Sequence, residues 1–359
     1  MRIGMNCGVF ATALAACSLP SVDDQNATCG PSMIVRTSTG ETFSSFEDAV
    51  ESAHTEDSFC VGAGTYSMDS AALQHGDSGP YSQSLRIVGA GAGETVLVAT
   101  NDETLAYVQI AGSLLVEGLT ISGGRVRLEA DDLVVRDLEF TDYAGWKRGL
   151  SLQGETVDVE GLEIHDNTMD YASGLFVDAR QVGTISGLSL HDNRSAAGYL
   201  AELHGAIELS SSHISANVRT DDQPGYDLLE FFGPSVAQDV VFEDNDFNGP
   251  MVRAYDSLDA SELVVTRNET GYAAAVALMG PSRIQSSRIE SNTAPDGALG
   301  IYHNGSVALD SVNVEVAKGT NAPCDLAGKP CTDQSCMSQC FADTLGEGEP
   351  SWCDAYGCE

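Results

Sequence analysis

The stretch Leu162-Glu163-Ile164-His165-Asp166-Asn167 decides the fold. In it, and in later copies, an asparagine follows an apolar anchor such as Ile164 by three residues. The next copy reads Leu188-Ser189-Leu190-His191-Asp192-Asn193. The asparagines that share this position are Asn167, Asn193, Asn217, Asn245, Asn268 and Asn292, with steps of 26, 24, 28, 23 and 24 residues. A period of this length is too short for a βαβ unit and is typical of one coil of a solenoid.

Each repeat opens with a short alternation of apolar and polar residues, the pattern of a strand with one buried face. The same register of anchors extends upstream to Ile121 and downstream to Val314. A second strand is expected seven to twelve residues after each asparagine, and a third run often closes the coil. The sequence therefore predicts an all-β chain of stacked coils whose like strands pair in parallel.

Stacking places the asparagines above one another at one turn. Side-chain amides in such a column can bond the rungs above and below, as they do in stacked cross-β chains. We therefore interpret the six asparagines as a structural ladder. The two His-Asp-Asn triplets, at residues 165–167 and 191–193, are interpreted as part of this ladder rather than as metal or acid/base motifs.

The opening of the solenoid resembles that of the right-handed parallel β-helix (pectate-lyase-like) superfamily. The resemblance rests on residues 42–50 (TFSSFEDAV) and 59–66 (FCVGAGTY), and it extends over roughly residues 35–318. It implies a single-stranded right-handed β-helix of about 10 coils with an N-terminal capping helix. Ser44 and Glu47 form a capping-box pattern before an apolar face of Phe46, Val50 and Ala53, which agrees with a helix there.

The expected organisation has four parts. Residues 1–16 form a lipoprotein signal peptide, 17–34 a tether, 35–320 the β-helix and 321–359 a cysteine-rich tail. Leu14-Ala15-Ala16-Cys17 matches the bacterial lipobox, with Cys17 as the lipidation site, and an ordinary cleaved signal peptide is the alternative. Ser18 resembles the residue that sorts lipoproteins to the outer membrane. We therefore expect an exported protein, facing the periplasm or the cell surface, that meets the membrane only through this lipid anchor.

Eight cysteines remain in the mature chain, an even number that fits an oxidising compartment. Cys29 and Cys60 are the two near the cap, and we expect them to pair. The tail cysteines are expected to form a small stapled unit; they are Cys324, Cys331, Cys336, Cys340, Cys353 and Cys358. A zinc site is the alternative, but the tail contains no histidine and no tandem Cys-x-x-Cys pairs.

The charge balance bears on partners. The chain has 17 basic and 53 acidic residues and a formal net charge of −36, which argues against a nucleic-acid partner. A solvated acidic surface explains the charge most simply. No cofactor or metal site is expected; Ca²⁺ is the alternative, although EF-hand and calcium-binding nonapeptide patterns are absent.

Chemistry is expected on the outward residues of the second strand. Asp178, Glu202 and Glu230 are the catalytic candidates, and on successive coils their carboxylates would lie roughly 5–6 Å apart. The candidates for substrate binding are Phe176, His204, Phe232, Arg253, Tyr255 and Tyr302. A one-residue slip would turn every side chain to the other face, and the register of residues 199–204 is ambiguous. A partly solvated acidic face with packing aromatics is the alternative to a site.

These features favour a non-catalytic surface protein that binds polysaccharide or another envelope component. The alternative is a carbohydrate-active enzyme, a glycoside hydrolase or polysaccharide lyase, that uses the carboxylate column. The motif sets of polyuronate lyases and polygalacturonases are missing, which favours binding, whereas carboxylates beside aromatics favour an enzyme.

Overall fold

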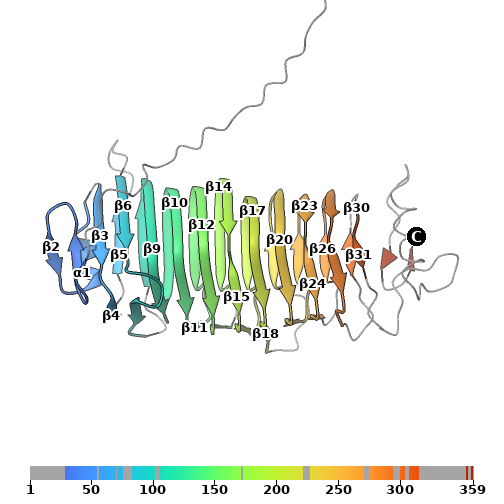
Figure 1. Ribbon diagram of the computed structural model, residues 1–359, viewed down its shortest axis with the longest axis horizontal. Helices are drawn as coiled ribbons and strands as arrows, with labels where there is room; N and C mark the ends of the chain where they lie inside the picture. Colours follow the sequence, from blue (N-terminus) through green and yellow to red (C-terminus); the bar gives the residue numbers. More distant parts are fainter. Residues whose placement is uncertain are drawn as a thin grey trace, which may run out of the picture.

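The computed structural model describes residues 29–54, 56–69, 71–75, 83–101, 105–170, 173–220, 227–270, 275–293, 300–303, 307–314, 353–354 and 357–358. Figure 1 shows these residues, from β2 at one end to β31, wound into a long stack of parallel strands. The described coils make about nine turns, close to the ten expected. The predicted all-β solenoid is confirmed.

The middle coils pair in register along their whole length. Strand β10 (Arg125–Thr141) runs parallel to β12 (Leu150–His165), so that Phe140 lies opposite Ile164. Strands β14 (Leu175–Ser186) and β17 (Ala201–Ser215) continue the stack. In β10, β12 and β17 the predicted runs are joined in one bent strand, because a single residue with positive φ turns the backbone without ending the hydrogen-bonded ladder; these residues are Asp137, Gly161 and Ser211.

The remaining strands follow the same columns as shorter pieces. Towards the N-terminus they are β1 (Ile34–Arg36), β2 (Glu41–Phe43), β3 (Asp57–Val61), β4 (Gly64–Met68), β5 (Ala71–His75), β6 (Gln83–Val88), β7 (Thr95–Ala99), β8 (Leu105–Ile110) and β9 (Gly112–Ser122). Towards the C-terminus they are β15 (Ser189–His191), β19 (Leu229–Phe231), β20 (Ser235–Glu243), β22 (Val252–Ala254), β23 (Leu258–Ser261), β24 (Val264–Thr266), β26 (Val276–Leu278), β27 (Ser282–Gln285), β28 (Arg288–Glu290), β29 (Ile301–His303), β30 (Val307–Asp310) and β31 (Asn313–Val314).

A second, narrow sheet runs beside the asparagines. It consists of two-residue strands: β11 (Ala144–Gly145), β13 (Thr168–Met169), β16 (Arg194–Ser195), β18 (Val218–Arg219), β21 (Asp246–Phe247) and β25 (Glu269–Thr270). The apolar anchors stack inside the solenoid, where Phe140, Ile164, Leu190 and Ile214 are at most 1% exposed. This dry column supplies the hydrophobic driving force of the fold.

The asparagine ladder is confirmed. Asn167 Nδ2 donates to Oδ1 of Asn193 at 2.9 Å, and the backbone N–H of Asn167 donates to the same oxygen at 3.1 Å. The pair Asn193 and Asn217 repeats both contacts at 3.0 and 3.1 Å, and the pattern continues to Asn292. A left-handed residue precedes each ladder asparagine, such as Asp166 with φ 55°. Aspartate tolerates this conformation, which explains why it precedes the asparagine in three of the six units.

Tyr143 takes the ladder position in the coil before Asn167. Its backbone N–H donates to Asn167 Oδ1 at 2.9 Å, so the first described rung ends on a main-chain group rather than on an amide. The Tyr143 side chain is 1% exposed, and its hydroxyl donates to the carbonyl oxygen of Lys147 at 2.8 Å. This contact holds the loop between β11 and β12 against the ladder.

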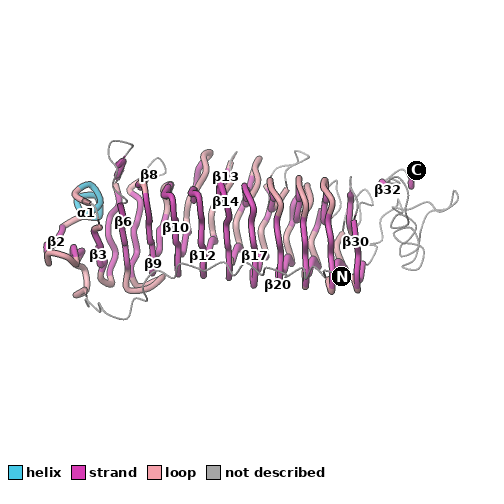
Figure 2. The backbone as a smooth tube through the Cα atoms, turned by 90° about the horizontal axis from the view of Figure 1, so that it is seen from above, coloured by secondary structure: helices cyan, strands magenta, loops and turns pink. Residues whose placement is uncertain are grey.

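A short helix, α1 (Phe46–Glu51), covers the N-terminal coils, as Figure 2 shows. Its buried residues Phe46, Ala49 and Val50 face the core, which confirms the capping helix. The predicted capping residue was wrong by one position. Ser45, not Ser44, has extended dihedrals and accepts a hydrogen bond from the N–H of Asp48, because that bond joins the cap to the third helical residue.

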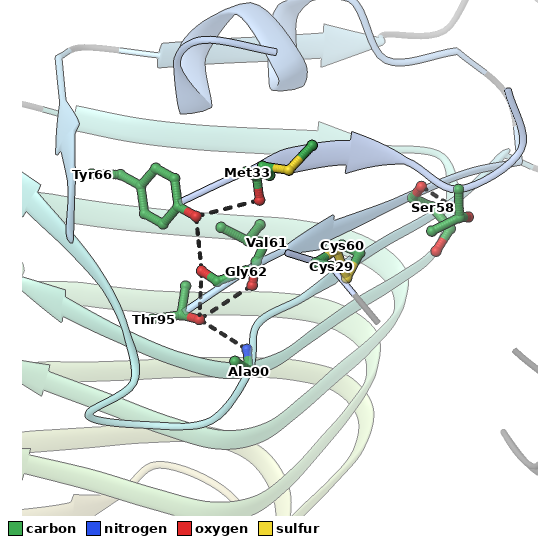
Figure 3. Close-up of a disulfide and its surroundings, with 10 residues drawn as sticks. Cys29, Met33, Ser58, Cys60, Val61, Gly62, Tyr66, Ala90 and Thr95 are labelled. Carbon is green, nitrogen blue, oxygen red and sulfur yellow. Dashed lines mark hydrogen bonds between the residues drawn. A yellow bond between two sulfur atoms is a disulfide. The ribbon is translucent and has the colours of Figure 1, made fainter. Parts of the chain in front are cut away.

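The Cys29–Cys60 disulfide is present, with a Cα–Cα distance of 6.0 Å, as expected. Figure 3 shows it beside Tyr66, whose hydroxyl donates to the carbonyl oxygen of Gly62 at 2.8 Å. The bridge therefore ties the chain before β1 to the edge of the first coils. Of the tail cysteines, Cys353 and Cys358 are backbone partners in the antiparallel pair β32 (Cys353–Asp354) and β33 (Gly357–Cys358). The other four tail cysteines, and Cys17, lie outside the described residues.

Candidate functional site

The predicted outward phase of the second strand is confirmed. Leu175 and Val177 are buried in the core, whereas Phe176 between them lies outside the core cluster. The backbone registers then place two outward columns side by side, which together we call the strip. The first column is Phe176, Glu202, Glu230 and Arg253; the second, two residues further along each coil, is Asp178, His204, Phe232 and Tyr255.

Glu202 and Glu230 are register partners on adjacent coils, as predicted. The expected position of Asp178 was wrong. Asp178 lies opposite His204, and Phe176 lies opposite Glu202, so the three carboxylates do not form one column. The reason is that Asp178 stands two residues later in its coil than Glu202 does in its own. Asp178 therefore belongs to the second column of the strip.

Glu230 instead has a buried carboxyl neighbour that the sequence did not indicate. Asp227 is 0% exposed and Glu230 is 1% exposed, and each carboxyl group shifts the pKa of the other. Burial raises the pKa of Asp227, and the contact with Glu230 raises it further. Burial likewise raises the pKa of Glu230. Two acids this close in a dry site share a proton, because both cannot be ionised.

Two side chains fix the geometry of this acid pair. The guanidinium of Arg253 binds Asp227 through Nε at 2.5 Å and Nη2 at 3.1 Å. The hydroxyl of Tyr255 donates to Oε1 of Glu230 at 3.1 Å. Tyr199 lies in the same electrostatic environment: burial and the neighbouring charge of Glu230 raise its pKa to about 12. The described surroundings therefore orient both carboxyl groups and keep both phenols protonated at neutral pH.

Glu202 stands in an environment of the opposite kind. Burial tends to raise its pKa, but the neighbouring polar groups of His204 and Ser173 and the charge of Arg148 outweigh burial and lower the pKa. Arg148 Nη2 lies 3.5 Å from Glu202 Oε2, and His204 Nε2 lies 3.6 Å from the same oxygen. At neutral pH Glu202 is thus ionised, one coil away from an acid pair that holds a proton. Environments that push two carboxyl pKa values apart are typical of acid/base sites.

The aromatic side chains of the second column stack on one another. The rings of His204 and Phe232 are 4.2 Å apart and 9° from parallel, and those of Phe232 and Tyr255 are 4.8 Å apart and 15° from parallel. The faces of Phe232 are therefore covered by its neighbours, and Phe232 and Tyr255 present edges at 38% and 41% exposure. The second column offers a ligand apolar edges beside the acid pair rather than open ring faces.

The other predicted binding residue, Tyr302, lies in β29 opposite Ala277, which itself follows Arg253 in the first column. Two residues that were not among the candidates belong to the site, Asp227 and Arg148. Arg148 was visible as part of the adjacent basic pair Lys147-Arg148. Nothing in the sequence marked Asp227 as a functional residue, because aspartates are common in the turns that precede strands.

The paired histidines lie on the ladder side of the coil. The rings of His165 and His191 are parallel, with centroids 5.1 Å apart. His165 Nε2 lies 2.8 Å from Glu139 Oε1, and His191 Nε2 lies 3.0 Å from Glu163 Oε1. Burial lowers the pKa of each imidazole, but hydrogen bonds with the neighbouring carboxylates outweigh burial and raise it.

The described residues also bear on metal binding and on membrane crossing. Among them, no group of three or more His, Cys, Asp or Glu side chains is arranged to hold a metal ion. Within the same part of the chain, no helix is long and apolar enough to cross a membrane. An open groove of about 530 Å³ lies on the neighbouring sheet, and it is lined by Pro234, Val236, Asp259, Pro281, Arg283 and Ala308 among others. It contains no residue of the strip.

No protein-family profile matches this sequence, and no curated protein sequence matches it either. Among solved structures, the chain is similar to the A-module of mannuronan C-5 epimerase AlgE4 of Azotobacter vinelandii, at 12% identity and a TM-score of 0.36 over 76% of this chain and 93% of that one. The AlgE6 A-module of the same organism gives 11% identity and 0.34, over 76% and 91%. The catalytic domain of a GH87 α-1,3-glucanase gives 11% and 0.23, over 73% and 64%.

Proposed function

We propose that this chain is a carbohydrate-active enzyme that cleaves a polysaccharide by acid/base chemistry at the strip. One observation carries the proposal: Asp227 and Glu230 are buried at 0% and 1% exposure, where burial raises both pKa values, while Glu202, the register partner of Glu230, lies 3.5 Å from the guanidinium of Arg148. A purely binding surface has no need of a proton held on dry carboxyl groups, since burying them costs stability. The geometry therefore favours the catalytic alternative over the binding protein that the sequence favoured.

The roles follow from the two environments. Glu230 donates its proton to the glycosidic oxygen as the C–O bond breaks, and Glu202 attacks the anomeric carbon to form a glycosyl ester. Water then hydrolyses the ester while Glu230 takes up the water proton. Adjacent strands lie about 4.8 Å apart, a spacing that fits the about 5–5.5 Å between carboxyl groups of retaining glycosidases better than the wider gap of inverting ones. Asp227, Arg253 and Tyr255 position Glu230.

The cellular setting is part of the proposal. Cys17 within the lipobox would anchor the mature chain to the outer membrane, with the solenoid outside the cytoplasm. The Cys29–Cys60 disulfide supports export, because disulfides persist in oxidising compartments. The substrate would then be a polysaccharide of the envelope or of the surroundings, met along the length of the solenoid.

The test compares wild type with Glu230→Gln and Glu202→Gln on a polysaccharide panel, with new reducing ends as the readout. We expect each substitution to lower kcat at least about 100-fold, the usual contribution of a positioned acid or base. Glu208→Gln is the matched control, because Glu208 is an exposed glutamate later in the same strand, β17, and outside the strip. Equal turnover in all four proteins would overturn the assignment. Binding without products in wild type would return the non-catalytic function.

A further inference from the structure

The described part of this acidic chain carries a local basic and aromatic cluster at one end of the strip. We call it the basic loop: Arg125, Trp146, Lys147 and Arg148. Trp146 is 56% exposed, and Lys147 Nζ lies 4.6 Å from the centroid of its ring. Arg125 Nε donates to the carbonyl oxygen of Arg148 at 3.4 Å. Three cations gathered within one turn are unusual in a protein with a net charge of −36.

The basic loop faces the strip. The guanidinium carbon of Arg148 lies 3.4 Å from the ring centroid of Phe176, and its Nη2 approaches Glu202 at 3.5 Å. The Arg148 side chain is 43% exposed, so its guanidinium retains donors that a ligand can reach. The hydroxyl of buried Tyr143 holds the loop at the Lys147 carbonyl. The cluster is thus a preorganised surface and not a loose loop.

The reacting end of the strip has the opposite character. Arg253 is the cation beside the acid pair, and both of its contacts go to Asp227, which is fully buried. An anionic sugar at Glu202 and Glu230 would meet carboxyl groups whose neighbouring cations are already engaged, Arg253 by Asp227 and Arg148 by Glu202. The coil of Trp146 and Lys147 lies three rungs from Glu230, about 14 Å at 4.8 Å per rung, so an anion there is separated from the reacting centre.

We propose that the strip recognises a heteropolysaccharide, with an uncharged sugar at Glu202 and Glu230 and an acidic sugar at Trp146 and Lys147. This inference rests on the proposed function for the identity of the reacting end. The anionic group, a carboxylate or sulfate, pairs with the cations of the basic loop, and Trp146 contacts the apolar face of the same sugar. The polymer lies along the solenoid axis, and its acidic unit is nearer the N-terminal cap.

Binding is measured by calorimetric titration with the Glu230→Gln protein, so that cleavage does not interfere. The probes are hyaluronan and gellan, which mix acidic and uncharged sugars, polygalacturonate, in which every sugar is acidic, and laminarin, in which none is. We expect a mixed polymer to bind tightest. Trp146→Ala with Lys147→Ala is expected to weaken that binding at least about tenfold and to leave laminarin unchanged. Arg283→Ala, which removes a cation from the groove on the neighbouring sheet, is expected to change neither.

The outcomes separate the two proposals. Polygalacturonate binding as tightly as both mixed polymers overturns the uncharged reacting sugar. An equal effect of the Trp146 and Lys147 changes on laminarin and mixed polymers, or no effect on either, overturns the anionic subsite. If the mixed polymer binds as expected but wild type releases no reducing ends, the recognition stands and the proposed catalysis falls. A rise from 50 to 500 mM NaCl is expected to weaken the mixed-polymer complex and to leave laminarin binding unchanged, because the screening length shortens with salt.

Discussion

The hydroxyl of Tyr255 donates to Oε1 of Glu230 at 3.1 Å and so links a phenol that is 41% exposed to a glutamate that is 1% exposed. The two residues stand on adjacent coils, and Tyr255 is also the last ring of the His204–Phe232 stack. A ligand that contacts the exposed edge of Tyr255 is therefore one hydrogen bond away from the proposed acid. Through Tyr255, contact with a ligand at the surface is coupled to the position of the proton on Glu230.

The first prediction concerns this hydrogen bond. The contact with Tyr255 lowers the pKa of Glu230, against burial, which raises it. Tyr255→Phe removes the contact and should raise the pKa, so Glu230 stays protonated to higher pH. In profiles of kcat/KM against pH, the alkaline limb of the variant should shift upward. Tyr107→Phe is the control, since its hydroxyl bonds Gln109 and Glu129 on a distant coil. A downward shift in Tyr255→Phe would contradict the role of Glu230 as the acid.

Asp227 should make the protein less stable as pH rises. Its ordinary pKa is 3.8, and burial raises the pKa in the folded state. Above pH 3.8 the unfolded chain has released a proton that the folded chain still holds, so the free energy of unfolding falls with pH, by about 1.4 kcal/mol per pH unit for one proton. Asp227→Asn should flatten this slope in urea unfolding between pH 5 and 8. The raised pKa values of His165 and His191 also make the free energy of unfolding fall with pH, so the variant is compared with wild type at each pH. An unchanged slope in Asp227→Asn would refute the shared proton.

The third prediction concerns the ladder. Asn217 is 0% exposed, and its amide bonds Asn245, Asn193 and the carbonyl oxygen of Leu190. Asn217→Ala leaves several buried backbone and amide groups unpaired, at about 1–3 kcal/mol each. We expect a loss of about 3–6 kcal/mol in the free energy of unfolding. Asn292→Ala, at the partly exposed end of the described ladder, should cost clearly less; equal costs would argue against cooperative stacking.

Tyr143 is predicted to hold the basic loop rather than the whole fold. Tyr143→Phe keeps the buried ring and removes the hydroxyl bond to Lys147, so stability should fall by only about 0.5–1.5 kcal/mol. Hydrogen exchange of the amides at residues 145–148 should accelerate, while that of β14 stays as in wild type. Acceleration spread evenly over the coils would mean that the hydroxyl supports the core instead.

The fold was predictable because each further copy of the repeat supports the same period and the same buried face. One Ile-x-x-Asn unit means little, but six at similar spacing constrain the period, the buried face and the ladder position together. The capping residue was missed by one position because Ser44 and Ser45 are both competent caps, and only the backbone dihedrals decide between them. The sequence pattern also did not predict that runs join into long strands such as β12. A single left-handed residue bends such a strand, and nothing in the sequence distinguishes this bend from a turn that ends a strand.

The site was predictable only in part. Alternation within a strand indicated which face Glu202, Glu230 and Arg253 occupy, and their alignment followed from the repeat. Asp178 was misplaced because coils of 23 to 28 residues absorb their extra length in turns, which sets the register of each strand independently of the Asn-to-Asn step. Asp227 was missed because residues distant in the sequence bury it, and the sequence around Asp227 does not reveal this burial.

The ladder amides make the same bonds at each interior rung, and this makes the length of the protein modular. Loss or duplication of one complete coil would restore the same contacts between its neighbours, whereas a shift of a few residues would break the column at that point. The molecule can therefore grow or shrink during evolution in steps of one rung, about 4.8 Å. The distance between the basic loop and the acid pair would change in the same steps. The number of coils between them would therefore set the spacing of the sugars that the strip recognises.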